Sequence, residues 1–217
     1  MAEARPRRVR CAACERPLVA CWCAFVKPTS CRHRIVVLQH PREARQTFGT
    51  ARILRQVLPH VELHVGETVS AEMASCVLDD PSRPPLLLFP APHADVWQPR
   101  APAGPRTIVV LDATWTQARR MFATSDWLRA LPAGRIVLDH ASLYTLREQP
   151  SPDGLCTLEA VAEAVAMLDG DAEVRDALVA PLRAMAGFQD ASHAAGSSAV
   201  LEDRARLVRD GYLPDAG

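Results

Sequence analysis

The chain has 217 residues, 48% of them hydrophobic, and its formal net charge at pH 7 is zero. This length and composition can bury the core of one large domain, or of one domain with a small appendage. No apolar run approaches the ~20 residues that span a bilayer, and residues 1–10, MAEARPRRVR, lack the apolar segment of a secretory signal. We therefore expect a soluble cytoplasmic protein without a membrane anchor.

The charges are distributed unevenly along the chain. Residues 1–34 contain eight basic and two acidic side chains, whereas residues 148–217 contain five basic and thirteen acidic ones. The N-terminal segment is thus a candidate surface for a polyanion. Lys27 is the only lysine of the chain, so nearly all of the positive charge comes from arginine. The excess of arginine has two open explanations, which are RNA binding and a GC-rich genome.

Four cysteines lie within thirteen residues, at Cys11, Cys14, Cys21 and Cys23. The pattern C-x2-C-x6-C-x-C brings enough thiolates together for one tetrahedral zinc ion. Disulfides are the alternative, but a reducing cytosol disfavours them. The C-x-C spacing is short, so Cys31 is a possible substitute ligand.

A small zinc knuckle among basic residues predicts an RNA-binding appendage. Its expected RNA contacts are Arg7, Arg8 and Arg10. Two further cysteines, Cys76 and Cys156, stand in apolar company, and we expect both to be core thiols.

Apolar runs without polar alternation follow, and helical patterns lie between them. This order favours an α/β fold with a mostly parallel sheet flanked by helices. The expected strands are residues 35–38, 86–89, 108–111 and 136–138. The expected helices are residues 43–58, 115–122, 157–168 and 172–185, and Pro181 is expected to kink or end the last one.

Residues 191–198 predict a flexible linker to a short amphipathic tail helix. The expected domains are accordingly a basic zinc knuckle at 1–33, a catalytic α/β domain at 34–189, and a linker with tail helix at 190–217. No strand is followed by G-x-G-x-x-G, and no Walker-type glycine loop is present. The sequence therefore signals neither a Rossmann dinucleotide site nor a P-loop.

Asp112 stands between the apolar run at 107–111 and a helix start. Thr114 and Gln117 fit a capping box, so Asp112 is not needed as the helix cap. Open α/β sheets present ligand-binding groups at the carboxyl ends of their strands, where Asp112 is expected to lie. From the residues alone, a cap or a loop contact stays an alternative role for this carboxylate.

The stretch LDATW at 111–115, followed by QARRM, resembles the D-x-T-W signature of the DTW-domain family. The cysteine cluster, LFPAPHAD at 88–95 and YTLREQPSPDGLCTLEA at 144–160 resemble further family segments in the same order. Together they cover residues 11–187. Two departures are Ala113, where many members carry Gly, and Gly49-Thr50, where an Asn-Thr pair is common.

The resemblance implies a SPOUT-like α/β fold, related to knotted RNA methyltransferases, and the activity of a tRNA-uridine aminocarboxypropyltransferase. Such enzymes transfer the 3-amino-3-carboxypropyl group of S-adenosylmethionine to the imino nitrogen of uridine and release methylthioadenosine. Two alternatives stay open. One is a methyltransferase that uses the same cofactor and fold, and the other is a non-catalytic zinc-knuckle protein that binds RNA.

For this reaction the site must align the nucleophile with one carbon of the sulfonium, and a base near the uridine would help. Asp112 is the candidate catalytic residue, either as that base or as a charge that attracts the sulfonium. The expected cofactor contacts are Leu88, Pro90, Leu111, Thr114, Trp115, Tyr144, Arg147, Cys156, Thr157 and Glu159.

Several of these residues have two interpretations. Arg147 pairs with the methionyl carboxylate or forms a structural salt bridge. Glu159 holds the substrate amine or complements a helix dipole. Trp115 could be a core aromatic residue, and Arg119 and Arg120 are either RNA contacts or a solvated helix face. The expected partner is tRNA, and the expected assembly is a monomer.

Overall fold

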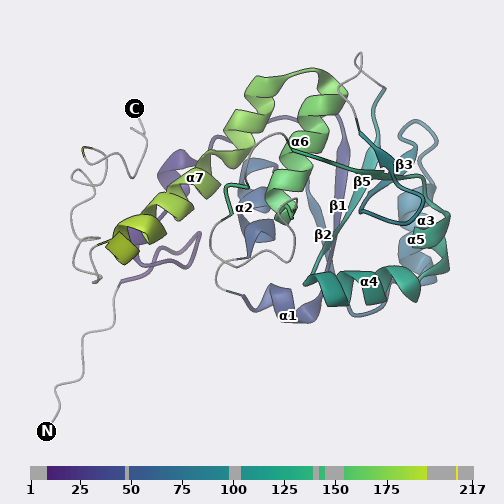
Figure 1. The fold of residues 1–217 in the computed structure, drawn as a ribbon, viewed down its shortest axis with the longest axis horizontal. Coiled ribbons are helices and arrows are strands. Elements are labelled where there is room, and N and C mark those ends of the chain that lie inside the picture. Colours follow the sequence, from purple (N-terminus) through teal and green to yellow (C-terminus); the bar gives the residue numbers. More distant parts are fainter. Residues whose placement is uncertain are drawn as a thin grey trace, which may run out of the picture. The chain divides into compact units, whose positions relative to one another are not determined.

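The computed structural model describes residues 9–46, 49–97, 104–138, 142–144, 154–194 and 209. The fold is mixed α/β, with a parallel sheet flanked by helices (Figure 1). The chain divides into two compact units: Lys27–Val179, and Met1–Val26 together with Ala180–Gly217. The first unit contains the whole sheet, and the second contains the cysteine cluster.

Six strands of the described segments form the sheet, in the order β2-β1-β5-β3-β6-β4, and every neighbouring pair is parallel. The strands are β1 (Arg34–Gln39), β2 (Glu62–Val65), β3 (Pro85–Leu88), β4 (Asp95–Val96), β5 (Thr107–Asp112) and β6 (Ala133–Arg135). β1 and β5 are both interior strands and pair along their whole length, up to Gln39 opposite Asp112. The predicted fold class is therefore confirmed.

Helices cover both faces of this sheet, with α2 and α6 on one side and α3 and α5 on the other (Figure 1). The helices are α1 (Pro41–Ala44), α2 (Thr50–Val57), α3 (Ala71–Leu78), α4 (Trp115–Ala123), α5 (Asp126–Ala130), α6 (Thr157–Asp169) and α7 (Ala172–Ala194), with two 3-10 turns, η1 (Leu18–Ala20) and η2 (Cys23–Phe25). Val36 and Val109 belong to the core shared with α3, α4 and α5. Their neighbours Ile35 and Ile108 are buried as well. Burial on both faces explains why these strands lack polar alternation.

Three expected strands are confirmed as β1, β3 and β5, but the fourth was misplaced. β6 covers Ala133–Arg135 rather than residues 136–138, and it pairs with β3 through Ala133 and Gly134. A Cβ atom at Gly134 would lie 1.9 Å from Nε1 of Trp97. The strand needs a residue without a side chain there, so a search for apolar β-branched runs missed it.

Two helix predictions are confirmed as α4 and α6, and the single helix expected at 43–58 was wrong. The structure has α1 and α2 instead, and α2 begins after Gly49, whose backbone is extended with φ −65° and ψ 119°. Glycine is a poor residue for a helix interior, because it loses more conformational freedom than other residues.

Helix α7 continues past Pro181 to Ala194, so the proline does not end it, and Ala191 to Ala194 are helical rather than linker. Proline in a helix interior costs ~3 kcal/mol. Leu182, Met185 and Phe188, all at most 2% exposed, follow it at helical spacing, and burial of three such side chains can offset that cost. Apart from residue 209, the predicted tail lies outside the described residues.

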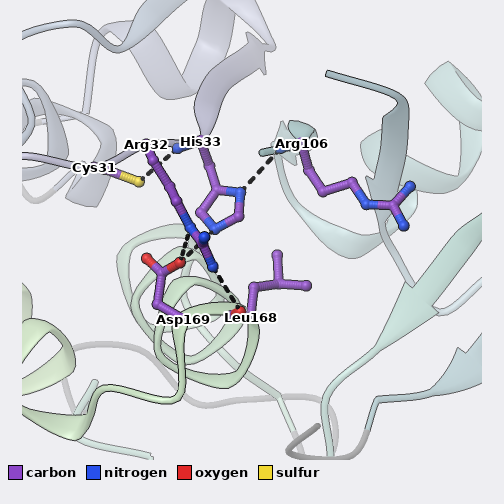
Figure 2. Close-up of polar contacts among 6 residues, drawn as sticks. All are labelled: Cys31, Arg32, His33, Arg106, Leu168 and Asp169. Carbon is purple, nitrogen blue, oxygen red and sulfur yellow. Dashed lines mark hydrogen bonds and ion pairs between the residues drawn. The ribbon is translucent and has the colours of Figure 1, made fainter. Parts of the chain in front are cut away.

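A buried histidine joins the starts of β1 and β5 to the end of α6 (Figure 2). Nδ1 of His33 accepts the backbone N–H of Arg106 over 3.1 Å, so Nε2 carries the proton of the neutral ring and donates to Asp169 over 3.0 Å. Arg32 contacts the same carboxylate at 2.5 Å. These bonds lie at the amino ends of the strands, away from Asp112.

Candidate active site and metal centre

A cavity of about 370 Å³ lies at the carboxyl ends of the central strands, and its volume is typical of small-molecule sites. β1, β3 and β5 end here, and α4 and α6 begin here. The lining residues are Glu43, Gly49, Thr50, Phe89, Val110, Leu111, Asp112, Ala113, Thr114, Trp115, Thr116, Ala118, Tyr144, Leu155, Cys156, Thr157 and Ala160. This is the edge at which open α/β sheets bind their ligands.

Asp112 is held in this cavity by donors from two other elements. Nε2 of Gln39 donates to Oδ2 over 2.7 Å, and the hydroxyl of Thr157 donates to Oδ1 over 2.5 Å. The residue is only 6% exposed. Hydrogen bonds to both oxygens fix the orientation of this carboxylate.

The cap of α4 is Thr114, and Asp112 has no part in it. The Thr114 hydroxyl accepts the backbone N–H of Gln117, and the Gln117 side chain accepts that of Thr114. The predicted capping box is confirmed. A helix cap therefore does not explain the carboxylate at position 112.

Aromatic side chains form part of the cavity wall. The rings of Phe89 and Trp115 lie 6.5 Å apart between centroids, and both residues line the cavity, as does the buried Tyr144. Trp115 also packs against the core shared with α3, α4 and α5. The two interpretations of Trp115 are thus compatible, because the ring separates core from cavity.

Glu159 uses its carboxylate for bonds within the protein. It accepts hydrogen bonds from the Ser142 hydroxyl at 2.8 and 3.0 Å, from the Leu143 N–H at 2.5 Å and from the Cys156 N–H at 3.1 Å. It is 3% exposed and does not belong to the cavity lining. Its contacts tie the start of α6 to the segment that presents Tyr144.

The structure therefore brings together most, but not all, of the predicted cofactor contacts. The residues that line the cavity are Leu111, Thr114, Trp115, Tyr144, Cys156 and Thr157. Leu88 and Pro90 do not line it, although Phe89 between them does. Arg147 lies outside the described residues.

The four N-terminal cysteines meet at one point. Their sulfur atoms all lie within 4.8 Å of one another, with Cys11 and Cys23 at 3.8 Å and Cys14 and Cys21 at 3.7 Å. Four sulfurs at Zn–S distances of ~2.3 Å in a tetrahedron would lie ~3.8 Å apart. A disulfide requires ~2.05 Å, and none of the four cysteines forms one. The arrangement fits a metal ion.

Local backbone donors prepare one of these sulfurs for metal binding. Hydrogen bonds from the backbone of Cys14, and then of Ala13, lower the pKa of Cys11 to about 6. The thiolate, which is the form that binds zinc, is therefore favoured at neutral pH. Burial raises the pKa of Cys21 and of Cys23.

Of the two core thiols predicted from the sequence, one is confirmed and the other was wrong, and the substitute ligand lies outside the cluster. Cys31 is not part of the four-sulfur group, and its sulfur accepts the backbone N–H of His33. Cys156 is buried, as expected, and burial raises its pKa. Cys76 is exposed on α3, so the prediction of a core thiol was wrong. The adjacent Val77 is buried instead, so an apolar neighbour in sequence does not place Cys76 in the core.

Four exposed arginines follow the strand ends that border the cavity. We call them the arginine rim: Arg42 and Arg45, on and just after α1, and Arg119 and Arg120 on α4. In the described part of the chain, none of the four forms an ion pair with a carboxylate, whereas Arg32, Arg34 and Arg175 do. Arg10 lies in the other unit, and Arg7 and Arg8 lie outside the described residues.

Comparison with known proteins adds a direct match, because the DTW domain matches residues 8–190. The chain belongs to the DTW domain family. No solved structure matches the chain.

Three relatives of this family member carry similar names. A Drosophila melanogaster protein named tRNA-uridine aminocarboxypropyltransferase 2 is 32% identical over 198 residues, which cover 84% of this chain and 76% of that protein. A Mus musculus protein of the same name is 28% identical over 223 residues, covering 98% and 72%. An Arabidopsis thaliana protein named tRNA-uridine aminocarboxypropyltransferase A is 27% identical over 225 residues, covering 86% and 83%.

Three polar residues of this DTW-domain cavity were not predicted from the sequence. Glu43 and Thr50 line it, and Gln39 orients Asp112. The one available signal was Gln39 itself, a polar residue at the end of an otherwise apolar strand, in the same position as Asp112 on β5.

None of the helices in the described segments is both long and apolar enough to cross a membrane.

Proposed function

We propose that this chain transfers the 3-amino-3-carboxypropyl group of S-adenosylmethionine to the imino nitrogen of a tRNA uridine. Relatives that align with most of this chain are named for this reaction and this substrate, and their names support the proposal. The cavity at the carboxyl ends of the strands supports the location of the active site. The observation that carries the proposal is Asp112, a buried carboxylate at a strand end that two other elements hold within an aromatic-lined cavity.

The residues present fit the proposed donor. Phe89, Trp115 and Tyr144 offer surfaces for an adenine ring. Asp112 and Glu43 are the acidic residues among the lining residues described, and no Arg, Lys or His lines the cavity with them. These two carboxylates would attract a ligand that carries a sulfonium and an ammonium group.

When bound, S-adenosylmethionine supplies an electrophilic carbon next to sulfur: uridine N3 bonds to it, the C–S pair returns to sulfur, and methylthioadenosine leaves. We assign the catalytic role to Asp112. Gln39 and Thr157 fix the carboxylate at the cavity wall, where it can take the N3 proton or face the positive sulfur. Gln39 and Thr157 are positioning residues, because they act through Asp112.

We further propose that tRNA contacts the arginine rim. α1 and α4 follow β1 and β5, whose carboxyl ends border the cavity, so phosphates beside the target uridine would meet exposed guanidinium groups. The N-terminal arginines Arg7, Arg8 and Arg10 are proposed as additional phosphate contacts.

The domain assignment belongs to the same proposal. Residues 1–33 form a knuckle with structural zinc bound by the four clustered cysteines, residues 34–189 form the catalytic domain, and residues 190–217 form a tail. The sulfur spacing supports the zinc site. We propose that the protein acts on tRNA as a monomer in the cytoplasm.

Nucleoside mass spectrometry tests the function directly. Purified protein is incubated with S-adenosylmethionine and unmodified tRNA, and the tRNA is digested to nucleosides. We expect aminocarboxypropyluridine in the digest and methylthioadenosine in the supernatant. Methyluridine with S-adenosylhomocysteine would instead identify a methyltransferase, and tRNA binding without any product would indicate a non-catalytic RNA-binding protein.

A further inference from the structure

Glu43 brings a second carboxylate to the cavity that contains Asp112. It lies on α1, directly after β1, and it is 8% exposed, whereas Arg42 and Arg45 beside it are exposed. The side chain of Glu43 therefore lies on the protein-facing side of α1. The residue also lines the cavity.

The two carboxylates come from adjoining strand ends. β1 and β5 pair up to Gln39 and Asp112, and the backbone N–H of His40 donates to the Asp112 carbonyl over 2.9 Å. This bond ties the start of α1, and so Glu43, to the end of β5. Glu159, near the start of α6, does not line the cavity, whereas Glu43 does.

We propose that Glu43 binds the ammonium of the aminocarboxypropyl group, while Asp112 lies toward the sulfonium and the uridine. The inference rests on the proposed function and names the residue that recognises the transferred part of the donor. An ammonium removed from water needs a charged or hydrogen-bonding partner. Among the described lining residues, the two carboxylates of Asp112 and Glu43 match the two positive groups of this donor.

Transfer removes the partner of Glu43 from the nucleoside product. After transfer the ammonium belongs to the modified uridine, and methylthioadenosine retains neither the ammonium nor the sulfonium charge. Glu43 then makes no charge-assisted bond to the nucleoside product. The same residue therefore favours binding of the intact donor over binding of methylthioadenosine.

Calorimetric affinities for three nucleosides test the inference without measuring catalysis. S-adenosylmethionine has both positive groups, S-adenosylhomocysteine has the ammonium with a neutral sulfur, and methylthioadenosine has neither. Glu43→Gln, which nearly preserves shape, is expected to weaken the first two by at least about tenfold and to leave methylthioadenosine unchanged. Glu43→Asp should recover part of the loss. Glu72→Gln, an exposed change on α3, is the matched control and should alter none of the three.

Equal weakening of all three ligands would overturn the inference, because Glu43 would then only shape the cavity. Unchanged affinity for all three would overturn it as well, even if transfer slowed. If wild type modifies tRNA and Glu43→Gln retains full affinity for the donor, the inference is disproved and the proposed function stands. If the three ligands show the expected pattern but wild type transfers nothing to tRNA, the inference stands and the proposed function is disproved. If wild type has no measurable affinity for S-adenosylmethionine, both are disproved.

Discussion

Gln39 and Asp112 are register partners at the ends of β1 and β5, and the Gln39 amide donates to the Asp112 carboxylate over 2.7 Å. The hydroxyl of Thr157, from the start of α6, donates to the other oxygen over 2.5 Å. A side chain held from two elements distant in sequence is fixed before any ligand binds. Such preorganisation is what a positioned catalytic group requires.

Asp112→Asn is expected to fold, but its free energy of unfolding should fall by about 1–2 kcal/mol, because the NH2 group of the asparagine then faces one of the two donors. It should transfer the aminocarboxypropyl group at least ~10²-fold more slowly. Single-turnover transfer and donor affinity are measured on the same variant. A slow rate with normal affinity indicates a base, and a joint loss indicates attraction of the sulfonium. Asp79→Asn, exposed after α3, is the control, and near-normal transfer by Asp112→Asn would exclude both roles.

The donors to Asp112 should matter through that residue. Thr157→Val removes a hydroxyl from a carboxylate oxygen and should lower kcat by about tenfold or more, whereas Thr157→Ser keeps the hydroxyl and should remain close to wild type. Gln39→Leu removes the donor to the other oxygen and should lower kcat by a similar factor. In an Asp112→Ala background these changes should cause little further loss, since coupled groups are not additive. Full additivity would contradict the positioning role.

The cysteine cluster should bind close to one zinc ion per chain. Elemental analysis of purified protein is expected to show this, and Cys11→Ser combined with Cys14→Ser should lose the metal. Cys31→Ser and Cys76→Ser are the controls and should retain it, because neither sulfur belongs to the four-sulfur group. Circular dichroism should show that the sheet, which lies entirely within Lys27–Val179, survives in the double variant. Zinc retained in full by that variant would refute the site.

Charge reversal at the arginine rim should weaken tRNA binding and flatten its dependence on salt, because fewer phosphates are neutralised. Each lost phosphate contact is expected to reduce the slope of log affinity against log salt by about 0.7 to 0.9. Arg129→Glu is the control, since this guanidinium already contacts Asp126 and the Ala123 carbonyl. Filter binding over a range of salt concentrations measures the slope.

Reversal of Arg7, Arg8 and Arg10 should have the same kind of effect while leaving donor affinity unchanged. If tRNA affinity at low salt is unaltered in either set of variants, that set is a solvated surface and not part of the RNA interface. The two sets are tested separately because they belong to different units of the structure.

The His33 site predicts a loss of stability in weak acid. Burial lowers the pKa of His33 below its usual 6.5, against the opposing attraction of Asp169, while Arg32 and Arg106 lower it further. Cys31 is the other titratable group beside it (Figure 2). Because the folded-state pKa is below the unfolded one, the unfolded chain binds the proton first as the pH falls. The stabilisation is complete above about pH 6.5 and is lost below it.

His33→Gln keeps a donor toward Asp169 but cannot be protonated in this range. The difference in unfolding free energy between wild type and this variant should therefore shrink between about pH 7.5 and 5.5. Denaturant unfolding at several pH values measures it, and titrations shared by both proteins cancel. A difference that stays constant with pH would show that His33 does not titrate against folding.

Features that depend only on local order along the chain could be predicted without the structure. The apolar runs of β1 and β5 show no alternation because both faces are covered, and this pattern is visible without coordinates. The cap of α4 needs only Thr114 and Gln117, three residues apart, and the confirmed box follows from helix geometry. The cysteine spacing likewise indicated a metal site, because all four ligands come from one short segment.

The tertiary structure decided everything that joins separate segments. Gln39, Glu43 and Thr157 meet Asp112 or its cavity only because β1 and β5 pair in one register and α6 returns to the same edge of the sheet. The glycine of β6 is explained by a tryptophan thirty-seven residues away in the chain. Glu159 has the sequence context of a ligand contact, yet the fold surrounds it with internal donors. Hydrogen bonding and close packing act across space, so the partner of a side chain is fixed by the fold and not by its neighbours in sequence.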